Sequence, residues 1–254
     1  MIEEQKQEEL NEEYRSINRL IEVSQRLAQR MSPPLLLNIP LDWYSGKRIL
    51  VVGQETMGWD FGKGSYYDWP FPELETFQNF LDIGASEAIP ALMHAYTSFE
   101  YARHQQKNYN SPFWRAYRQI RRSIGDAEDG LSTRVLWTNL FRISLDGGSV
   151  VKKGTKIEIG ALHKMSKWVL RREIEILSPT AIVFYTGPNY DQYLLGTFDN
   201  ANLYQADSAY EDRKLSVVEY SGLPKLTYRT YHPAYQRRSH QWELTDWICQ
   251  RLKS

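Results

Sequence analysis

Three polar side chains that could do chemistry each stand just after a short apolar run. Glu55, Asn139 and His232 supply a carboxylate, an amide and an imidazole. A carboxylate can orient water or stabilise a cation, an amide offers a donor and an acceptor, and an imidazole can exchange or donate a proton. One active site built from the ends of neighbouring strands would explain all three residues at once.

Each of the three also has a simpler structural explanation. Glu55 could be the acid of a helix N-terminus, Asn139 a turn former and His232 a histidine satisfied before a proline. Three separate explanations are then needed, whereas a shared site needs one. The residues alone leave both interpretations open.

The elements that must position these residues are short β-branched runs separated by helical periods. Strands are predicted at 48–52, 135–138, 181–185 and 226–231, with 215–220 as an additional strand hairpinned to the last through Ser221-Gly222. Helices are predicted at 3–30, 112–124, 159–177 and 242–252. This alternation predicts an α/β three-layer sandwich with a central, mostly parallel sheet of four or five strands, plus an N-terminal helix.

The chain is expected to hold one α/β domain. We divide it into an N-terminal helical extension, 1–45, which looks peripheral, and the α/β domain, 46–254. Ligands of open α/β sheets bind beyond the carboxyl ends of the strands, where loop amides and helix N-termini converge. Glu55, Asn139 and His232 are all expected at that edge.

Several other chemistries are excluded by the residue pattern. Trp59 and Asp60 stand where a phosphate-binding loop needs Lys and Ser or Thr, and the later Gly62-Lys63-Gly64 follows no strand. The single cysteine, Cys249, excludes an internal disulfide or a multi-thiolate metal site and is expected in the core of the last helix. We therefore expect neither a metal nor another cofactor.

Zero net charge, 31 basic against 31 acidic residues, hides an uneven distribution. Three basic islands stand at 101–124, 151–172 and 220–242, and the first and third contain no acid. Each island could be a solvated helix face. Their convergence on one face would favour a polyanion as partner.

The composition is that of a globular protein, with 42% hydrophobic and 24% charged residues. No run approaches the ~18 apolar residues of a membrane helix, and the first residues are acidic where a signal peptide would be basic. We expect a cytoplasmic protein with no membrane contact, and we infer no obligate protein partner.

Four strand ends in order resemble the motifs of the uracil-DNA glycosylase superfamily. Gly53-Gln54-Glu55 resembles the first motif, which reads Gly-Gln-Asp-Pro-Tyr-His in its best-known branch. Residues 135–139 are similar to the strand that ends in a base-reading Asn, 181–190 resemble the apolar strand before a Gly-containing turn, and His232-Pro233 resembles the late His-Pro motif. The resemblance runs from about Arg48 to His240 and omits the N-terminal helix.

This resemblance implies a monofunctional DNA glycosylase that leaves an abasic site. Glu55 would orient water and stabilise the cationic sugar, and His232, with backbone amides near Gln54, would donate to the departing base. Asn139 would read the Watson–Crick edge of a flipped-out base. No lysine stands at the matched strand ends, so no covalent Schiff base is expected.

Departures from the family pattern bear on the substrate. Thr56, Met57 and Gly58 replace Pro, Tyr and His, and in the family that Tyr excludes substituents at C5 of the pyrimidine. The wider space suggests a modified or enlarged pyrimidine, in repair or in defence against phage. Tyr67 is our choice for the aromatic that stacks on the base.

The loop after His232 is the expected contact with DNA. The family inserts an apolar side chain there, and this chain has Tyr235, Gln236, Arg237 and Arg238, which could fill the gap and hold phosphates. Single- or double-stranded DNA is not decided. The alternatives are a nucleic-acid-binding protein that has the fold without catalysis, and an enzyme acting on a small nucleotide.

Overall fold

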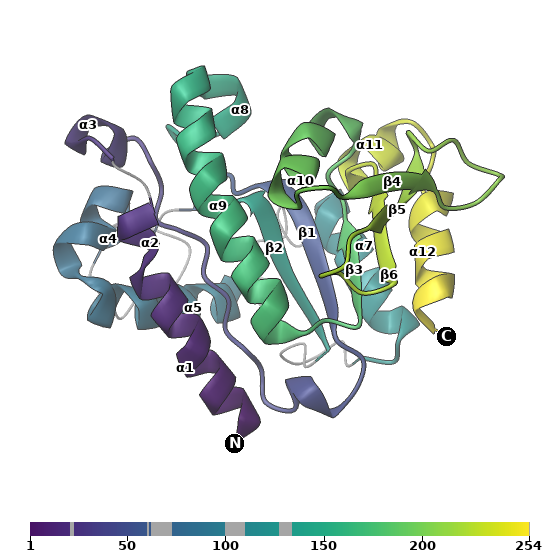
Figure 1. The fold of residues 1–254 in the computed structure, drawn as a ribbon, viewed down its shortest axis with the longest axis horizontal. Coiled ribbons are helices and arrows are strands. Elements are labelled where there is room, and N and C mark those ends of the chain that lie inside the picture. Colours follow the sequence, from purple (N-terminus) through teal and green to yellow (C-terminus); the bar gives the residue numbers. More distant parts are fainter. Residues whose placement is uncertain (21–22, 60, 62–72, 100–109, 127–133, 254) are drawn as a thin grey trace.

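A computed structural model describes residues 1–20, 23–59, 61, 73–99, 110–126 and 134–253. Its centre is a six-stranded sheet in the order β2-β1-β3-β6-β5-β4 (Figure 1). The strands are β1 (Ile49–Glu55), β2 (Val135–Phe141), β3 (Ala181–Phe184), β4 (Asn202–Gln205), β5 (Leu215–Glu219) and β6 (Leu226–Thr230).

Four adjacent strands are parallel and the last two are antiparallel. β1 pairs in parallel with β2 and β3, and β3 pairs in parallel with β6, whereas β5 runs antiparallel to both β6 and β4. The predicted α/β class and mostly parallel sheet are confirmed. The sixth strand, β4, was not predicted because it is an exposed edge strand with no apolar run to signal it.

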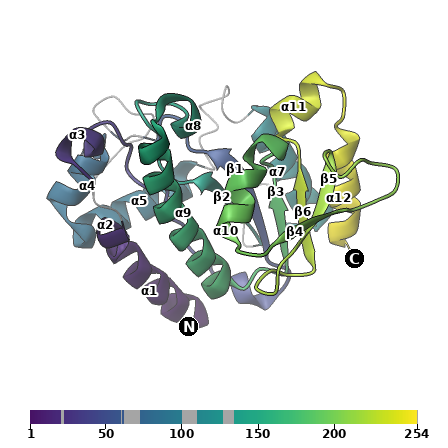
Figure 2. The same ribbon diagram turned by 45° about the horizontal axis from the view of Figure 1, so that its top comes forward.

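Helices cover both faces of the sheet (Figures 1 and 2). One group contains α7 (Pro112–Ser123) and α12 (Glu243–Lys253), and the other contains α9 (Lys156–Leu177) and α10 (Asp191–Thr197). The other elements are η1 (Trp43–Ser45), α4 (Phe77–Ile83), α5 (Ala85–Phe99), α8 (Val150–Lys153), η2 (Pro188–Tyr190) and α11 (Pro233–Arg238). The three later helices predicted from the sequence are therefore confirmed.

The N-terminal segment differs from its prediction. It forms α1 (Ile2–Arg15), α2 (Ile17–Leu20) and α3 (Gln25–Ala28) in place of one helix over 3–30. Leu10, Tyr14 and Ile17 are fully buried, and α1 packs on α9. The segment therefore contributes to the core and is not peripheral.

A buried polar network joins this segment to the end of β2. The Tyr14 hydroxyl donates to Glu173 in α9 at 2.7 Å and accepts the Leu37 N–H at 2.9 Å. Glu173 forms a fully buried ion pair with Arg142, the residue after β2. Burial raises the pKa of Glu173. Removing either charge would leave the other buried without a counter-ion.

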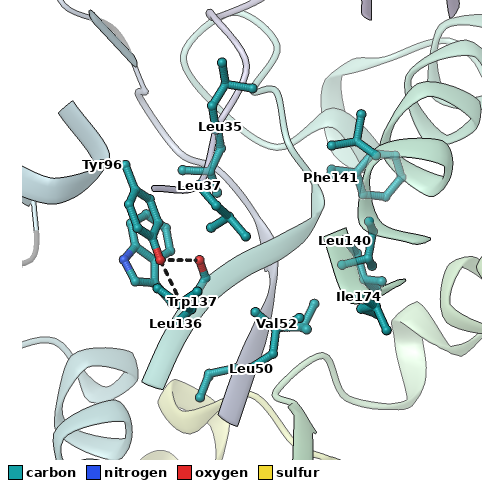
Figure 3. Close-up of a cluster of buried hydrophobic side chains, with 14 of the residues drawn as sticks. Leu35, Leu37, Leu50, Val52, Tyr96, Leu136, Trp137, Leu140, Phe141 and Ile174 are labelled. Carbon is teal, nitrogen blue, oxygen red and sulfur yellow. Dashed lines mark hydrogen bonds between the residues drawn. The ribbon is translucent and has the colours of Figure 1, made fainter. Parts of the chain in front are cut away.

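Apolar side chains from the extended segment after α3 join the strands in the core. Figure 3 shows Leu35 and Leu37 among buried side chains of β1 and β2. The Tyr96 hydroxyl accepts a hydrogen bond from the N–H of Trp137 and donates one to its carbonyl, both at 3.1 Å.

Cys249 is buried as predicted, and burial raises the pKa of its thiol to about 11. Within the described residues, no helix is long and apolar enough to cross a membrane.

Candidate functional site

The carboxyl ends of the four parallel strands meet at one edge of the sheet. Helices α8, α10 and α11 lie at this edge, after β2, β3 and β6 respectively (Figures 1 and 2). Glu55 is the last residue of β1, Asn139 lies two residues before the end of β2, which continues past the predicted 135–138, and His232 lies two residues after β6, so all three lie near this edge. They belong to two separate clusters there.

The first, which we call the amide cluster, consists of Gly53, Phe113, Asn139 and His232. Gly53 pairs with Asn139 across β1 and β2. A Cβ on Gly53 would lie 2.2 Å from Asn139 Oδ1 and 3.3 Å from the Phe113 ring. The amide and the aromatic ring therefore lie directly over a backbone position that only glycine leaves open.

The Asn139 side chain lacks hydrogen-bond partners. It is only 7% exposed, yet in the described part of the chain its amide makes no hydrogen bond. Nearly all buried polar side chains in folded proteins are bonded to protein or water. An amide with both functions unused at a strand end is suited to bind the polar edge of a ligand.

His232 is a neutral imidazole with one nitrogen available. It caps the N-terminus of α11, and its Nδ1 accepts the Ala234 N–H at 3.2 Å. Nδ1 is thus unprotonated and Nε2 carries the hydrogen. Burial lowers the pKa of His232 to about 4. Among the described residues Nε2–H has no partner, so it is an available donor at neutral pH.

Phe113 is a member of this cluster that the sequence did not identify as functional. Its ring is stacked with the His232 ring at a centroid distance of 6.1 Å and an interplanar angle of 15°. Ser111 and Pro112 begin α7 immediately before it, as predicted. Phe113 could have been identified only from the start of α7 at the carboxyl edge of the sheet, and this position depends on the topology.

The second, the carboxylate cluster, surrounds Glu55. Its Oε1 accepts the Ser149 hydroxyl at 2.9 Å and the Tyr190 hydroxyl, and its Oε2 accepts the Val150 N–H at 2.5 Å. Ser149 and Val150 begin α8. The carboxylate is thus fixed by three donors from two elements.

Tyr190 itself is anchored by the surrounding loop. It ends η2, directly before Asp191, whose carboxylate forms a 3.0 Å ion pair with the buried guanidinium of Arg229 in β6. Burial and the Glu55 carboxylate raise the pKa of Tyr190, so it is a neutral donor. No sequence pattern assigns Tyr190 or Ser149 to Glu55, because neither residue is near it in the chain.

The two clusters are adjacent along β1 but are not bonded to each other. Gly53 and Glu55 are two residues apart on that strand. Across the described residues no hydrogen bond or ion pair links Glu55 to Asn139 or His232. The three predicted residues therefore share one edge of the sheet, with Glu55 in the carboxylate cluster and Asn139 and His232 in the amide cluster.

The other residues predicted to bind the base are Gln54, Met57 and Tyr67, and their surroundings differ. Gln54 Nε2 donates to the Thr186 carbonyl at 2.6 Å, so its side chain ties β1 to the loop after β3. Met57 is 67% exposed and precedes Gly58, whose φ is +64°. Tyr67 lies outside the described residues.

The prediction that Gln236 contacts DNA is wrong. Its side chain is fully buried, donates to the Tyr231 carbonyl at 2.7 Å and accepts the Thr245 hydroxyl at 2.8 Å. It stabilises α11 from within and cannot face a ligand. Tyr235, Arg237 and Arg238 are exposed on α11.

Parts of all three basic islands face this edge. Several of their cations are neutralised elsewhere, including Arg121 by Asp126, Lys167 by Asp199 and Arg172 by Glu13. Exposed cations with no ion pair in the described structure remain on α7, α8, α9 and α11: Arg115, Lys152, Lys156, Arg237 and Arg238.

No protein-family model and no curated protein matches this chain. Among the residues that the structure describes, no three His, Cys, Asp or Glu side chains come together as a candidate metal site. The site is therefore interpreted from its own geometry.

Proposed function

We propose that the protein is a monofunctional DNA glycosylase that hydrolyses the N-glycosidic bond of a flipped-out base. The observation that carries the proposal is the unbonded Asn139 amide next to the Phe113 ring, which in turn stacks with the neutral His232 ring. An amide to read a base edge, an aromatic ring and a neutral donor are the groups that recognition of an extruded nucleobase requires.

The proposed reaction separates charge between sugar and base. Water adds to C1′ and gives up a proton, the C1′–N bond breaks, and its electron pair leaves with the base, which takes up one proton, so that OH ends on the sugar and H on the base. His232 Nε2–H donates to the base as negative charge develops there, and a neutral imidazole keeps that proton available across neutral pH. Asn139 holds the base in register.

Glu55 supplies the negative charge for the sugar. Three donors fix its carboxylate, and two carboxylate oxygens can accept about four hydrogen bonds, which leaves room for one from water. A fixed carboxylate stabilises an oxocarbenium-like sugar without reorganisation. The exposed Met57 and the adjacent Gly58 support the proposal of a modified or enlarged pyrimidine.

The test is formation of abasic sites. Duplex and single-stranded oligonucleotides that carry uracil, 5-substituted cytosines or glucosylated cytosines are incubated with the protein and then cleaved with alkali. We expect strand scission at one class of modified base, at a rate about 10²–10³ lower with Asn139→Ala. Absence of scission on every substrate would reject the enzyme.

The second candidate is a DNA-binding protein of the same architecture without catalysis. It is favoured by the bonding of Glu55 to Ser149 and Val150, which alone would explain this residue as a cap of α8. Glu55→Gln separates the two. The enzyme loses turnover with DNA affinity retained, whereas a pure binding protein loses no measurable function.

A further inference from the structure

Three planar side chains adjoin the candidate site, one just before α11 and two on it. Tyr231 lies directly before His232, its ring is tilted by 49° against the Tyr235 ring at a centroid distance of 4.6 Å, and the Arg238 guanidinium lies over the Tyr235 ring at 5.5 Å. We call Tyr231, Tyr235 and Arg238 the stacking ladder. Gly187 lies beside Tyr231, the inner end of the ladder: a Cβ on Gly187 would lie 3.6 Å from the Tyr231 ring.

The ladder is open to a ligand at its outer end. Tyr235 is 40% exposed, which is unusual for an aromatic ring already packed on another. Arg237 and Arg238 are exposed and make no ion pair in the described structure. The segment 220–242 contains no acidic residue, so no carboxylate of this segment offsets these two charges.

We propose that the stacking ladder binds unpaired bases of single-stranded DNA next to the base held by Asn139. Faces of tyrosine and guanidinium groups stack on bases of any sequence, but only on bases that are not already stacked in a duplex. The guanidinium of Arg237 and the edge of the Arg238 guanidinium neutralise phosphates between those bases. The proposal rests on the proposed function in choosing DNA as the ligand and in placing a base at Asn139.

The ladder differs from a wedge that fills the gap left by a flipped base in a duplex. A wedge needs apolar bulk, so leucine would serve as well as tyrosine. A stacking ladder needs a flat ring, so leucine fails and phenylalanine succeeds. The two roles are therefore separated by one position, Tyr235.

The experiment measures fluorescence anisotropy of labelled oligothymidine, a single strand in which no base is paired. We expect Tyr235→Ala and Tyr235→Leu to weaken binding about tenfold or more, and Tyr235→Phe to bind like the wild type. Arg238→Ala should also weaken binding and reduce the slope of log affinity against log salt by ~0.7, the value of one phosphate contact. Tyr204→Ala, at an exposed tyrosine on the far edge strand β4, is the matched control and should change nothing.

Three results would overturn the ladder: no measurable binding of oligothymidine by the wild type, full affinity with Tyr235→Leu, or a loss confined to duplexes that contain an abasic gap. Circular dichroism confirms that each variant is folded. Because oligothymidine binding requires no cleavage, a protein that binds it through Tyr235 but forms no abasic sites supports the ladder and rejects the glycosylase.

Discussion

The carboxylate cluster and the amide cluster lie at the same edge of one sheet, yet they differ in how completely their polar atoms are bonded. In the carboxylate cluster, Glu55 receives three hydrogen bonds from Ser149, Val150 and Tyr190. In the amide cluster, Asn139 receives and donates none within the described structure, and His232 uses one nitrogen of two.

This difference indicates two kinds of preparation for a ligand. A group that must act through charge benefits from being fixed in advance, because no reorganisation is then needed during reaction. A group that must recognise a ligand keeps its donors and acceptors available, at a cost in the unliganded protein that the ligand relieves. Stability and activity should therefore respond differently to changes in the two clusters.

The largest combined effect is expected for Glu55→Gln. The new amide places a donor against the Ser149, Tyr190 and Val150 donors, so at least one buried bond is lost and the free energy of unfolding falls by about 2 kcal/mol. Loss of the charge lowers the rate of base excision by about 10²–10³. Urea unfolding and single-turnover excision check the two parts. Unchanged stability would contradict the bonding of this cluster.

Asn139→Ala should lower excision by a similar factor, about 10²–10³, with less than about 1 kcal/mol lost in stability, because the amide has no hydrogen bond to lose. Gly53→Ala tests the same point from the other side. Its Cβ would lie 2.2 Å from Asn139 Oδ1 and must displace the amide. If either variant excises at the wild-type rate, Asn139 does not read the base.

A pH dependence of stability is expected from His232. Its pKa falls from 6.5 in the unfolded chain to about 4 in the folded protein, so between these values the unfolded state binds more protons. The contribution of this residue is complete above pH 6.5 and is lost as the pH falls toward 4, by about 3 kcal/mol. The difference in unfolding free energy between wild type and His232→Gln, measured from pH 4 to 7, isolates it. A flat difference would show that His232 is not buried as a neutral ring.

Much of the fold could be predicted because the parallel strands are continuous apolar runs. Val51, Val183 and their neighbours are buried on both faces, and such runs need no tertiary information to be recognised. The exposed β4 and the break in the N-terminal helix have no such signal. Burial of Tyr14 depends on Glu173 and Arg142, which are more than 120 residues away in sequence.

The candidate site could be predicted only in outline. Strand ends locate Glu55, Asn139 and His232 at one edge, but side-chain partners depend on loops that the strand pattern does not fix. Phe113 reaches His232 only because α7 begins at that edge, and Gln236 is buried because α11 turns it toward Thr245. On this short helix Gln236 is buried while its neighbours Tyr235 and Arg237 are exposed, and periodicity over six residues cannot reveal this difference.

The smallest effect that distinguishes the two clusters is expected for Tyr190→Phe. The substitution removes one of three donors to Glu55 and leaves the ring in place, so stability falls by about 1 kcal/mol and excision falls about fivefold to tenfold through kcat, with KM unchanged. Tyr193→Phe, on the neighbouring α10, is the matched control, because its hydroxyl makes no hydrogen bond to the carboxylate. A change in KM alone would place Tyr190 in substrate binding, and equal losses in both variants would mean that the ring environment, and not the bond to Glu55, is what the substitution alters.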